Sequence, residues 1–226
     1  MGDFRCIAIE TATIESGVAA CNGDQTAMVR LNESRNTSRR LYHAIAEAME
    51  RVELVIADID CVAYGCGPGS FTGVRVAAGA AQALSFAQNV PVCRVSSLAA
   101  LAQAALRQAT SMPVAACVDA RMGEVYLGIY ERDANGELVT LGEDSLVGPD
   151  DFRFARGAGQ MMLAGNGWGA YPELVANNSA FVTASDFDVW PDALAVIEIA
   201  RKQFLGGDVV ESFAALPNYL RNKVTY

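Results

Sequence analysis

The pattern of hydrophobic and polar positions in the first hundred residues predicts strands followed by alternating helices and strands. Three short apolar segments come first, and Asn22-Gly23 between the second and third is typical of a two-residue β-hairpin turn. Apolar residues at helical spacing then predict amphipathic helices between further strands. The predicted strands are Phe4–Ile9, Gly17–Cys21, Thr26–Leu31, Cys61–Tyr64 and Val90–Val95, and the predicted helices are Thr37–Val52 and Thr72–Ala87.

The second half repeats the opening pattern. The predicted strand Val114–Val118 ends on an acid, as Phe4–Ile9 does, and a turn, a strand and a second Asn-Gly pair follow. This repetition predicts two similar α/β units. We place the boundary between residues 1–105 and 106–226, and the helix predicted near 192–205 is a candidate to pack back on the first unit.

Composition excludes several classes of protein. The 226 residues are 52% hydrophobic and carry a net charge of −9, so binding of nucleic acid by this chain alone is disfavoured, because such binding needs Lys and Arg to neutralise phosphates. A single histidine, His43, leaves little for a histidine-based metal site. Six cysteines without C-x-x-C spacing, no export signal and no membrane-spanning run predict a cytoplasmic protein with reduced thiols.

A glycine-rich segment after the strand Cys61–Tyr64 is the most informative motif. Four glycines in nine residues permit positive φ and close backbone approach, and a helix N-terminus can bind an anion. The motif lacks the Gly-Lys-[Ser/Thr] of a Walker A loop, so a tight strand-to-helix turn capped by Ser70 or Thr72 is favoured over a phosphate cradle. Its residues are Gly67, Pro68, Gly69, Ser70, Phe71, Thr72 and Gly73, followed by Val74 and Arg75.

The helix that this turn opens is rich in alanine and glycine around most of its circumference. A helix that is apolar all round is buried on more than one side. Its own sheet can cover one side, and either another part of the chain or a partner subunit must cover the other. The sequence leaves these two interpretations open.

Two acids, Glu10 and Asp119, end corresponding strands of the two halves. In phosphotransferases built from paired βββ units, this turn carries an acid and hydroxyl groups that contact a metal-bound phosphate, and here Thr11 and Thr13 would supply the hydroxyls. An ordinary polar hairpin is the favoured interpretation unless the fold is established. For Asp119, a structural ion pair with Arg121 is the corresponding alternative.

Several segments together resemble the TsaB (YeaZ-like) family, the smaller paralogue of the Kae1/TsaD family in the actin–hexokinase–Hsp70 (ASKHA) superfamily. The resemblance spans essentially the whole chain and implies an α/β fold of two tandem ribonuclease-H-like subdomains. The matching segments are Ile7–Thr13, Tyr64–Arg75, Val95–Leu98, Asp119–Tyr126 and Tyr219–Arg221.

The resemblance implies a non-catalytic scaffold that activates a TsaD-like paralogue. Together with a TsaE-like ATPase, that pair transfers a threonylcarbamoyl group to the adenosine 3′ of the anticodon in tRNAs that read A-starting codons. The resemblance implies no cofactor on this chain, because ATP and metal are expected on the partners, and contact with tRNA only through the complex. It implies no membrane contact and leaves open a homodimer when the chain is alone.

The resemblance also implies roles for particular residues. The helices of the N-terminal subdomain would form the partner interface, through Leu41, Ile45, Ala48, Met49, Val74, Ala77, Ala78, Ala81 and Leu84. Glu10, Thr11 and Thr13 would be a vestigial phosphate turn, since the family has Asp at position 10. The family also has a histidine where Thr37 stands. The alternative function is an ATP-dependent phosphotransferase or ATPase that uses Glu10, Thr11 and Asp119.

Overall fold

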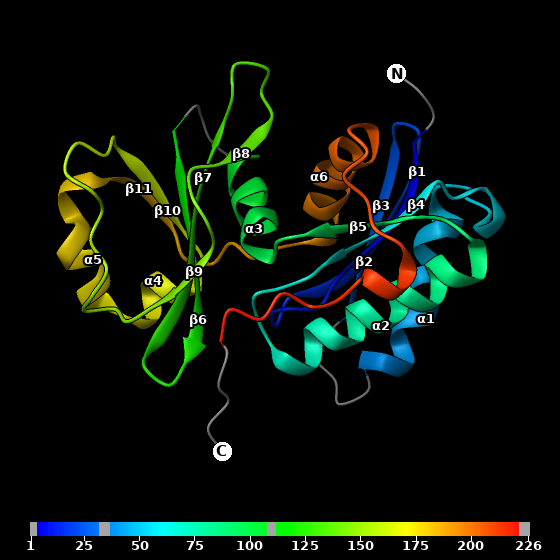
Figure 1. Ribbon diagram of the computed structural model, residues 1–226, viewed down its shortest axis with the longest axis horizontal. Coiled ribbons are helices and arrows are strands. Elements are labelled where there is room, and N and C mark those ends of the chain that lie inside the picture. Colours follow the sequence, from blue (N-terminus) through cyan, green and yellow to red (C-terminus); the bar gives the residue numbers. More distant parts are fainter. Residues whose placement is uncertain (1–3, 32–36, 108–111, 222–226) are drawn as a thin grey trace. The chain divides into compact units, whose positions relative to one another are not determined.

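The chain forms two compact units in the computed structural model, which describes residues 4–31, 37–107 and 112–221 (Figure 1). Unit 1 combines Met1–Ala100 with Pro191–Asn218, and unit 2 combines Leu101–Trp190 with Tyr219–Tyr226. The expected boundary at 105/106 is therefore corrected, because the C-terminal third of the chain does not stay in one unit. The helix predicted near 192–205 packs on the unit 1 sheet, and the whole segment Pro191–Asn218 that contains it belongs to unit 1.

Unit 1 is built on a five-stranded sheet with the order β3-β2-β1-β4-β5. The first three strands are antiparallel, and β4 and β5 run parallel to β1. The strands are β1 (Arg5–Glu10), β2 (Ser16–Asn22), β3 (Gln25–Leu31), β4 (Cys61–Gly65) and β5 (Val92–Val95). The helices are α1 (Thr37–Arg51), α2 (Phe71–Gln88), α6 (Ala193–Leu205) and the short 3₁₀ segments η1 (Ile56–Asp58) and η3 (Ser212–Ala214). Helix α3 (Ser97–Leu106) begins in unit 1 and continues into unit 2.

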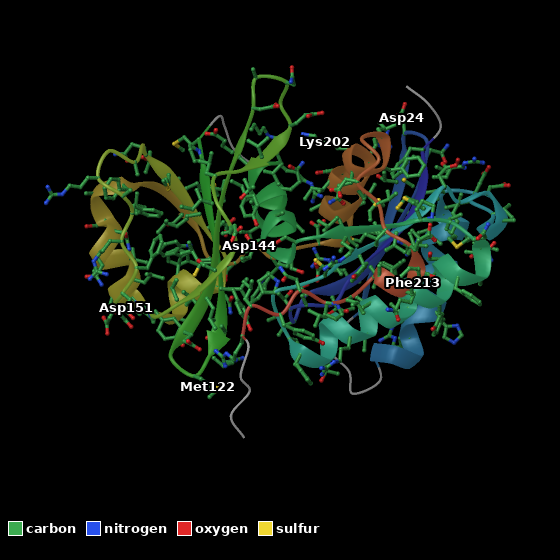
Figure 2. All side chains as sticks on the ribbon, viewed as in Figure 1. Asp24, Met122, Asp144, Asp151, Lys202 and Phe213 are labelled. Carbon is green, nitrogen blue, oxygen red and sulfur yellow. The ribbon has the colours of Figure 1, made fainter. Side chains whose placement is uncertain are left out.

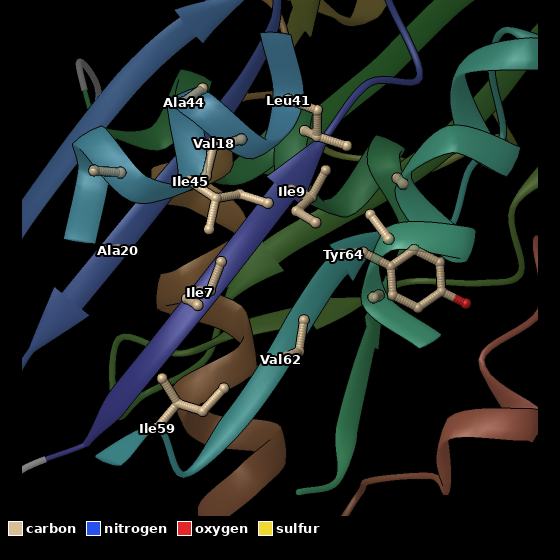
Figure 3. Packing of buried hydrophobic residues seen from close by; sticks show 14 of the residues in the cluster. Ile7, Ile9, Val18, Ala20, Leu41, Ala44, Ile45, Ile59, Val62 and Tyr64 are labelled. Atoms are coloured by element: carbon tan, nitrogen blue, oxygen red, sulfur yellow. The ribbon is translucent and has the colours of Figure 1, made fainter. Parts of the chain in front are cut away.

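Alternation along the strands divides the core of unit 1 into two layers. Ile7 and Ile9 point to the face that α1 and α2 cover, where they pack with Leu41 and Ile45 (Figure 3). Cys6 and Glu10 point to the opposite face, and α6 packs against the strands on that side (Figure 1). Both faces of the sheet are thus covered, which explains why its central strands are buried throughout.

Unit 2 repeats this plan with the order β11-β10-β6-β7-β8, in which β7 is antiparallel to β6 and β10 is parallel to it. Trp168 is fully buried in its core and donates its indole N–H to Ala115 O at 2.9 Å. The strands are β6 (Val114–Arg121), β7 (Glu124–Arg132), β8 (Leu138–Thr140), β9 (Ser145–Val147), β10 (Met161–Ala164) and β11 (Val182–Asp186). The helices are α4 (Asn166–Ala170), α5 (Pro172–Asn178) and the 3₁₀ segment η2 (Ser179–Phe181).

The predicted duplication is confirmed, since a βββ unit followed by parallel strands occurs in both sheets. The sequence pattern located the strands of unit 1 within two residues but missed five elements of unit 2: β9, α4, α5, η2 and β11. These elements are short, and β11 is half-buried along its length, so it has no continuous apolar run. No helix in the described part of the chain is long and apolar enough to cross a bilayer.

Candidate functional site

The turn between β1 and β2 holds a fully buried carboxylate, that of Glu10. The backbone N–H of Ala12 donates to Glu10 Oε1 at 2.6 Å, and the hydroxyl of Ser97 donates to Oε2 at 2.9 Å. Burial away from water raises the pKa of Glu10 to about 7, although both hydrogen bonds act in the opposite direction. The predicted phosphate turn therefore contains an acid that is already satisfied by its own chain.

The glycine-rich segment packs directly on this turn. Ser70 N donates to Ala12 O at 2.7 Å, and the hydroxyl of Thr11 donates to Gly73 O at 2.7 Å. A Cβ atom on Gly73 would lie 1.8 Å from Thr11 O, and one on Gly69 would lie 2.4 Å from Ala12 O. These glycines are needed because the two backbone segments approach too closely for a side chain.

The start of α2 is capped by Ser70, whose Oγ accepts from Gly73 N at 3.3 Å. This is the cap that the tight-turn interpretation predicts, and Thr72 does not serve in that role. Gly67 has a φ of +97° and Pro68 is buried, so both belong to the tight turn itself. Thr13, the third residue of the predicted phosphate turn, has a buried hydroxyl oxygen without a hydrogen-bond partner.

The corresponding turn of unit 2 is built differently. Asp119 accepts from the backbone N–H of Arg121 at 2.8 Å, pairs with the Arg121 guanidinium at 3.3 Å and receives the hydroxyl of Tyr171 at 3.3 Å. The predicted ion pair with Arg121 is therefore present. Arg221 holds the other side of this turn, donating to Ala120 O at 3.1 Å and to a Glu124 carboxylate oxygen at 2.6 Å.

Most of the residues predicted to contact a partner are buried inside unit 1 and not on its surface. Eight of the nine are buried inside unit 1, most of them packed against its sheet, and the ninth, Leu84, is partly buried against the same cluster. The apolar stripe of each helix faces its own sheet, since that burial is what holds the helix in place. The buried residues are Leu41, Ile45, Ala48, Met49, Val74, Ala77, Ala78 and Ala81.

The opposite face of α2 is exposed and still largely apolar. Phe86 is 81% exposed and Phe71 is 49% exposed. The guanidinium of Arg75 stacks over the Phe71 ring at 3.3 Å from its centroid. We call this face the α2 outer stripe; it consists of Phe71, Thr72, Arg75, Gly79, Ala83 and Phe86. The sequence predicted a second apolar side on this helix, but none of the residues predicted for the interface lies on the α2 outer stripe. Phe86, an apolar residue off the buried stripe, indicates this side.

The outward face of α1 points the same way, because both helices cover the same face of the unit 1 sheet (Figure 1). Tyr42 is 55% exposed there, and His43 and Glu47 are exposed beside it. The lone histidine therefore lies on the surface. Among the described residues, no group of three or more His, Cys, Asp and Glu side chains is arranged as a metal site.

Comparison with known proteins gives consistent results. The family model described as TsaD, tRNA N6-adenosine threonylcarbamoyltransferase, matches residues 31–179. The tRNA threonylcarbamoyladenosine biosynthesis protein TsaB of Escherichia coli is 36% identical, over 99% of this chain and 97% of its own. The protein of the same name from Haemophilus influenzae is 33% identical, over 100% of this chain and 97% of its own.

A solved structure described as YeaZ from Pseudomonas aeruginosa superposes with a TM-score of 0.88 at 33% identity, covering 96% of this chain and all of that one. The sequence matches and this structural match extend over both units, so the likeness is not limited to the glycine-rich segment. The expected α/β fold of two tandem ribonuclease-H-like subdomains is confirmed. The chain belongs to the TsaB (YeaZ-like) family.

Proposed function

We propose that this chain takes part in tRNA threonylcarbamoyladenosine biosynthesis as a non-catalytic scaffold that binds and activates a TsaD-like paralogue. In this proposal a TsaE-like ATPase works with the pair, and the threonylcarbamoyl group is transferred to the adenosine 3′ of the anticodon in tRNAs that read A-starting codons. ATP, metal and most tRNA contacts belong to the partners, and the complex works in the cytoplasm. The full-length likeness to proteins named for this pathway supports the role.

The state of the Glu10 turn supports a non-catalytic role. Its carboxylate oxygens, the Thr11 hydroxyl and the Ser70 amide all bond to groups of unit 1. A phosphate or metal would have to displace these bonds and separate two backbone segments in close contact. A scaffold needs no such rearrangement.

The observation that carries the proposed interface is the α2 outer stripe. Two exposed aromatic rings stand at its ends, and small residues lie between them, where Gly79 has open space around its Cβ position. Large exposed apolar groups on one helix face are typical of a protein-binding surface. Small residues between them allow a partner helix to approach closely.

The interface can be tested with Gly79→Arg and Ala83→Arg, because both side chains would point away from the core. The matched control is Ala176→Arg, at an alanine that is also exposed, on α5 of unit 2. We expect each stripe variant to remain folded by circular dichroism and to lose co-purification with the TsaD-like protein, measured by native mass. The control should retain the pair. If both stripe variants still co-purify with the TsaD-like protein, the α2 outer stripe is not the interface.

The assignment of nucleotide to the partners is tested separately by isothermal titration of the purified chain with Mg-ATP. We expect no binding in the low-micromolar range. Binding in that range that is lost in Thr11→Val would instead favour the alternative phosphotransferase or ATPase, because the Thr11 hydroxyl lies in the turn where phosphate would bind.

A further inference from the structure

Four segments of unit 1 converge on the Glu10 carboxylate. The β1–β2 turn contributes the Ala12 amide, and the start of α3 contributes the Ser97 hydroxyl. The end of β4 contributes Gly65, where a Cβ atom would lie 1.9 Å from Glu10 Oε2. Asp192, which caps α6 by accepting from Ala195 N at 2.7 Å, acts on Glu10 through its charge.

The same turn is bonded to the first turn of α2. Ala12, whose N–H binds Glu10, accepts from Ser70 N through its carbonyl, and Ser70 caps the helix. Thr11, next to Glu10 in the chain, donates its hydroxyl to Gly73 O. One hydrogen-bonded path therefore leads from the buried carboxylate through Ala12 to Ser70, and a second connection runs along the backbone to Thr11 and from its hydroxyl to Gly73.

Protonation of Glu10 changes the strength of the hydrogen bonds that its carboxylate accepts. Asp192 is the ionisable group among the residues of these four segments that influence Glu10. Its negative charge favours the protonated form of Glu10 over the ionised carboxylate and so raises the pKa of Glu10. An ionised carboxylate accepts stronger hydrogen bonds than a neutral carboxyl group does. When Glu10 takes a proton from water, its bonds from the Ala12 amide and the Ser97 hydroxyl weaken.

We infer that Glu10 is a positioning residue for the start of α2 and that its protonation loosens the connection between the β1–β2 turn and residues 70–73. Because Phe71 and Thr72 begin the α2 outer stripe, the loosening would alter the surface offered to a partner. That second step rests on the proposed function, whereas the first concerns this chain alone.

The first step is tested by amide NMR of the isolated, full-length chain. The amide signals of Ala12, Ser70 and Gly73 should shift between about pH 5.5 and 8.5 with one common midpoint near 7. In Glu10→Gln the chemical shifts of these three amides should not change over the same pH range. Histidine also titrates near neutral pH as a residue type, so the control is His43→Gln, which should leave the midpoint unchanged.

A second variant keeps the test decisive if Glu10→Gln does not fold. Ser97→Ala removes a hydrogen bond that favours the ionised carboxylate, so the common midpoint should move to higher pH. Signals that do not titrate in the unmodified chain would overturn the inference. It would also fail if the signals titrated in Glu10→Gln or kept their midpoint in Ser97→Ala.

The second step is measured as affinity for the TsaD-like partner at about pH 6 and 8. We expect several-fold weaker binding at the lower pH for the unmodified chain and a smaller change for Glu10→Gln. If the amides titrate but affinity does not change, Glu10 positions α2 without regulating the pair. If no pair forms at either pH, the proposed function fails while the amide result stands.

Discussion

The two halves of this chain begin alike and then use their first turns differently. In unit 1, Glu10 pairs with Gly17 across a long connection, whereas in unit 2, Arg121 pairs with Glu124 across a two-residue turn. The start of the Glu10 turn, residues 10–12, is buried beneath segments distant in sequence, Ser97 and the glycine-rich segment. The Asp119 turn ends in an exposed tip, with the Arg121 side chain 83% exposed.

This contrast shows that a duplicated strand–acid–turn pattern does not fix what the acid does. Glu10 accepts from Ala12 in its own turn and from Ser97 elsewhere in unit 1, and it is fully buried, so its role depends on the tertiary structure. The Asp119 carboxylate bonds to Arg121 of its own turn and accepts from the Tyr171 hydroxyl, and the Asp119 backbone N–H donates to Asn166. Substitutions in each turn, or in the segment packed on it, should therefore have unequal effects.

The largest expected difference lies between Gly73→Ala and Gly123→Ala. The first places a methyl group 1.8 Å from a backbone oxygen of Thr11, so the turn and α2 must separate, at a cost of about 3–5 kcal/mol in the free energy of unfolding. The second meets nothing within 4 Å and pays only for a φ of +77°, about 1 kcal/mol. Urea denaturation followed by circular dichroism measures both.

Gly79→Ala is the control for the helix, since Gly79 lies in α2 with open space around it. Alanine there should stabilise the chain by about 0.5–1 kcal/mol. A Gly73→Ala variant that is as stable as the unmodified chain would mean that the close approach to Thr11 is not required.

A smaller effect is expected from Glu10→Gln, and it appears in the pH dependence of stability. The folded state holds the Glu10 proton up to about pH 7, whereas an ordinary carboxyl group releases it near 4.5. Stability from this group is therefore fully present below about pH 4.5 and is lost as pH rises to 7, a loss of about 3 kcal/mol. The variant should lack this loss, measured by urea denaturation at several pH values.

Asp119→Asn supplies the matched comparison in unit 2, where the side chain of Asp119 is 11% exposed. If this variant changed the pH dependence as much as Glu10→Gln does, the effect would come from any turn carboxylate and not from the enclosure of Glu10. The contrast between the turns would then be lost.

The sequence allowed the duplicated fold to be predicted because apolar strands and Asn-Gly turns are local signals. It also limited the cap of α2 to Ser70 or Thr72, of which Ser70 serves, since capping depends on a few neighbouring residues. The bonds from Ser97 to Glu10 and from Arg221 to the turn of unit 2 could not be derived, because they join residues 87 and 97–101 positions apart. No local pattern encodes such a separation.

The residues predicted for the interface are buried for a related reason. Apolar residues at helical spacing mark a buried stripe, and Ala78 and Ala81 are buried by their own sheet. A partner-binding face must instead be sought among apolar residues off that stripe, such as Phe86. When a helix has two apolar faces, the sequence does not show which one is covered by the sheet and which one is left for a partner.

The smallest expected effect concerns the tip of the unit 2 turn, where Met122 is exposed (Figure 2). Met122 and Gly123 have φ of +58° and +77°, the conformation of a two-residue hairpin that favours Asn-Gly. Met122→Asn should therefore raise the free energy of unfolding by about 1 kcal/mol. Met122→Ala removes the same sulfur contact with Arg221 but keeps the strain, so it should not raise the free energy of unfolding.

Trp168 fluorescence during urea denaturation reports on unit 2, whose core buries this residue. If asparagine were no better than alanine, backbone conformation would not limit the stability of this turn, and the contrast with the enclosed Glu10 turn would rest on packing alone.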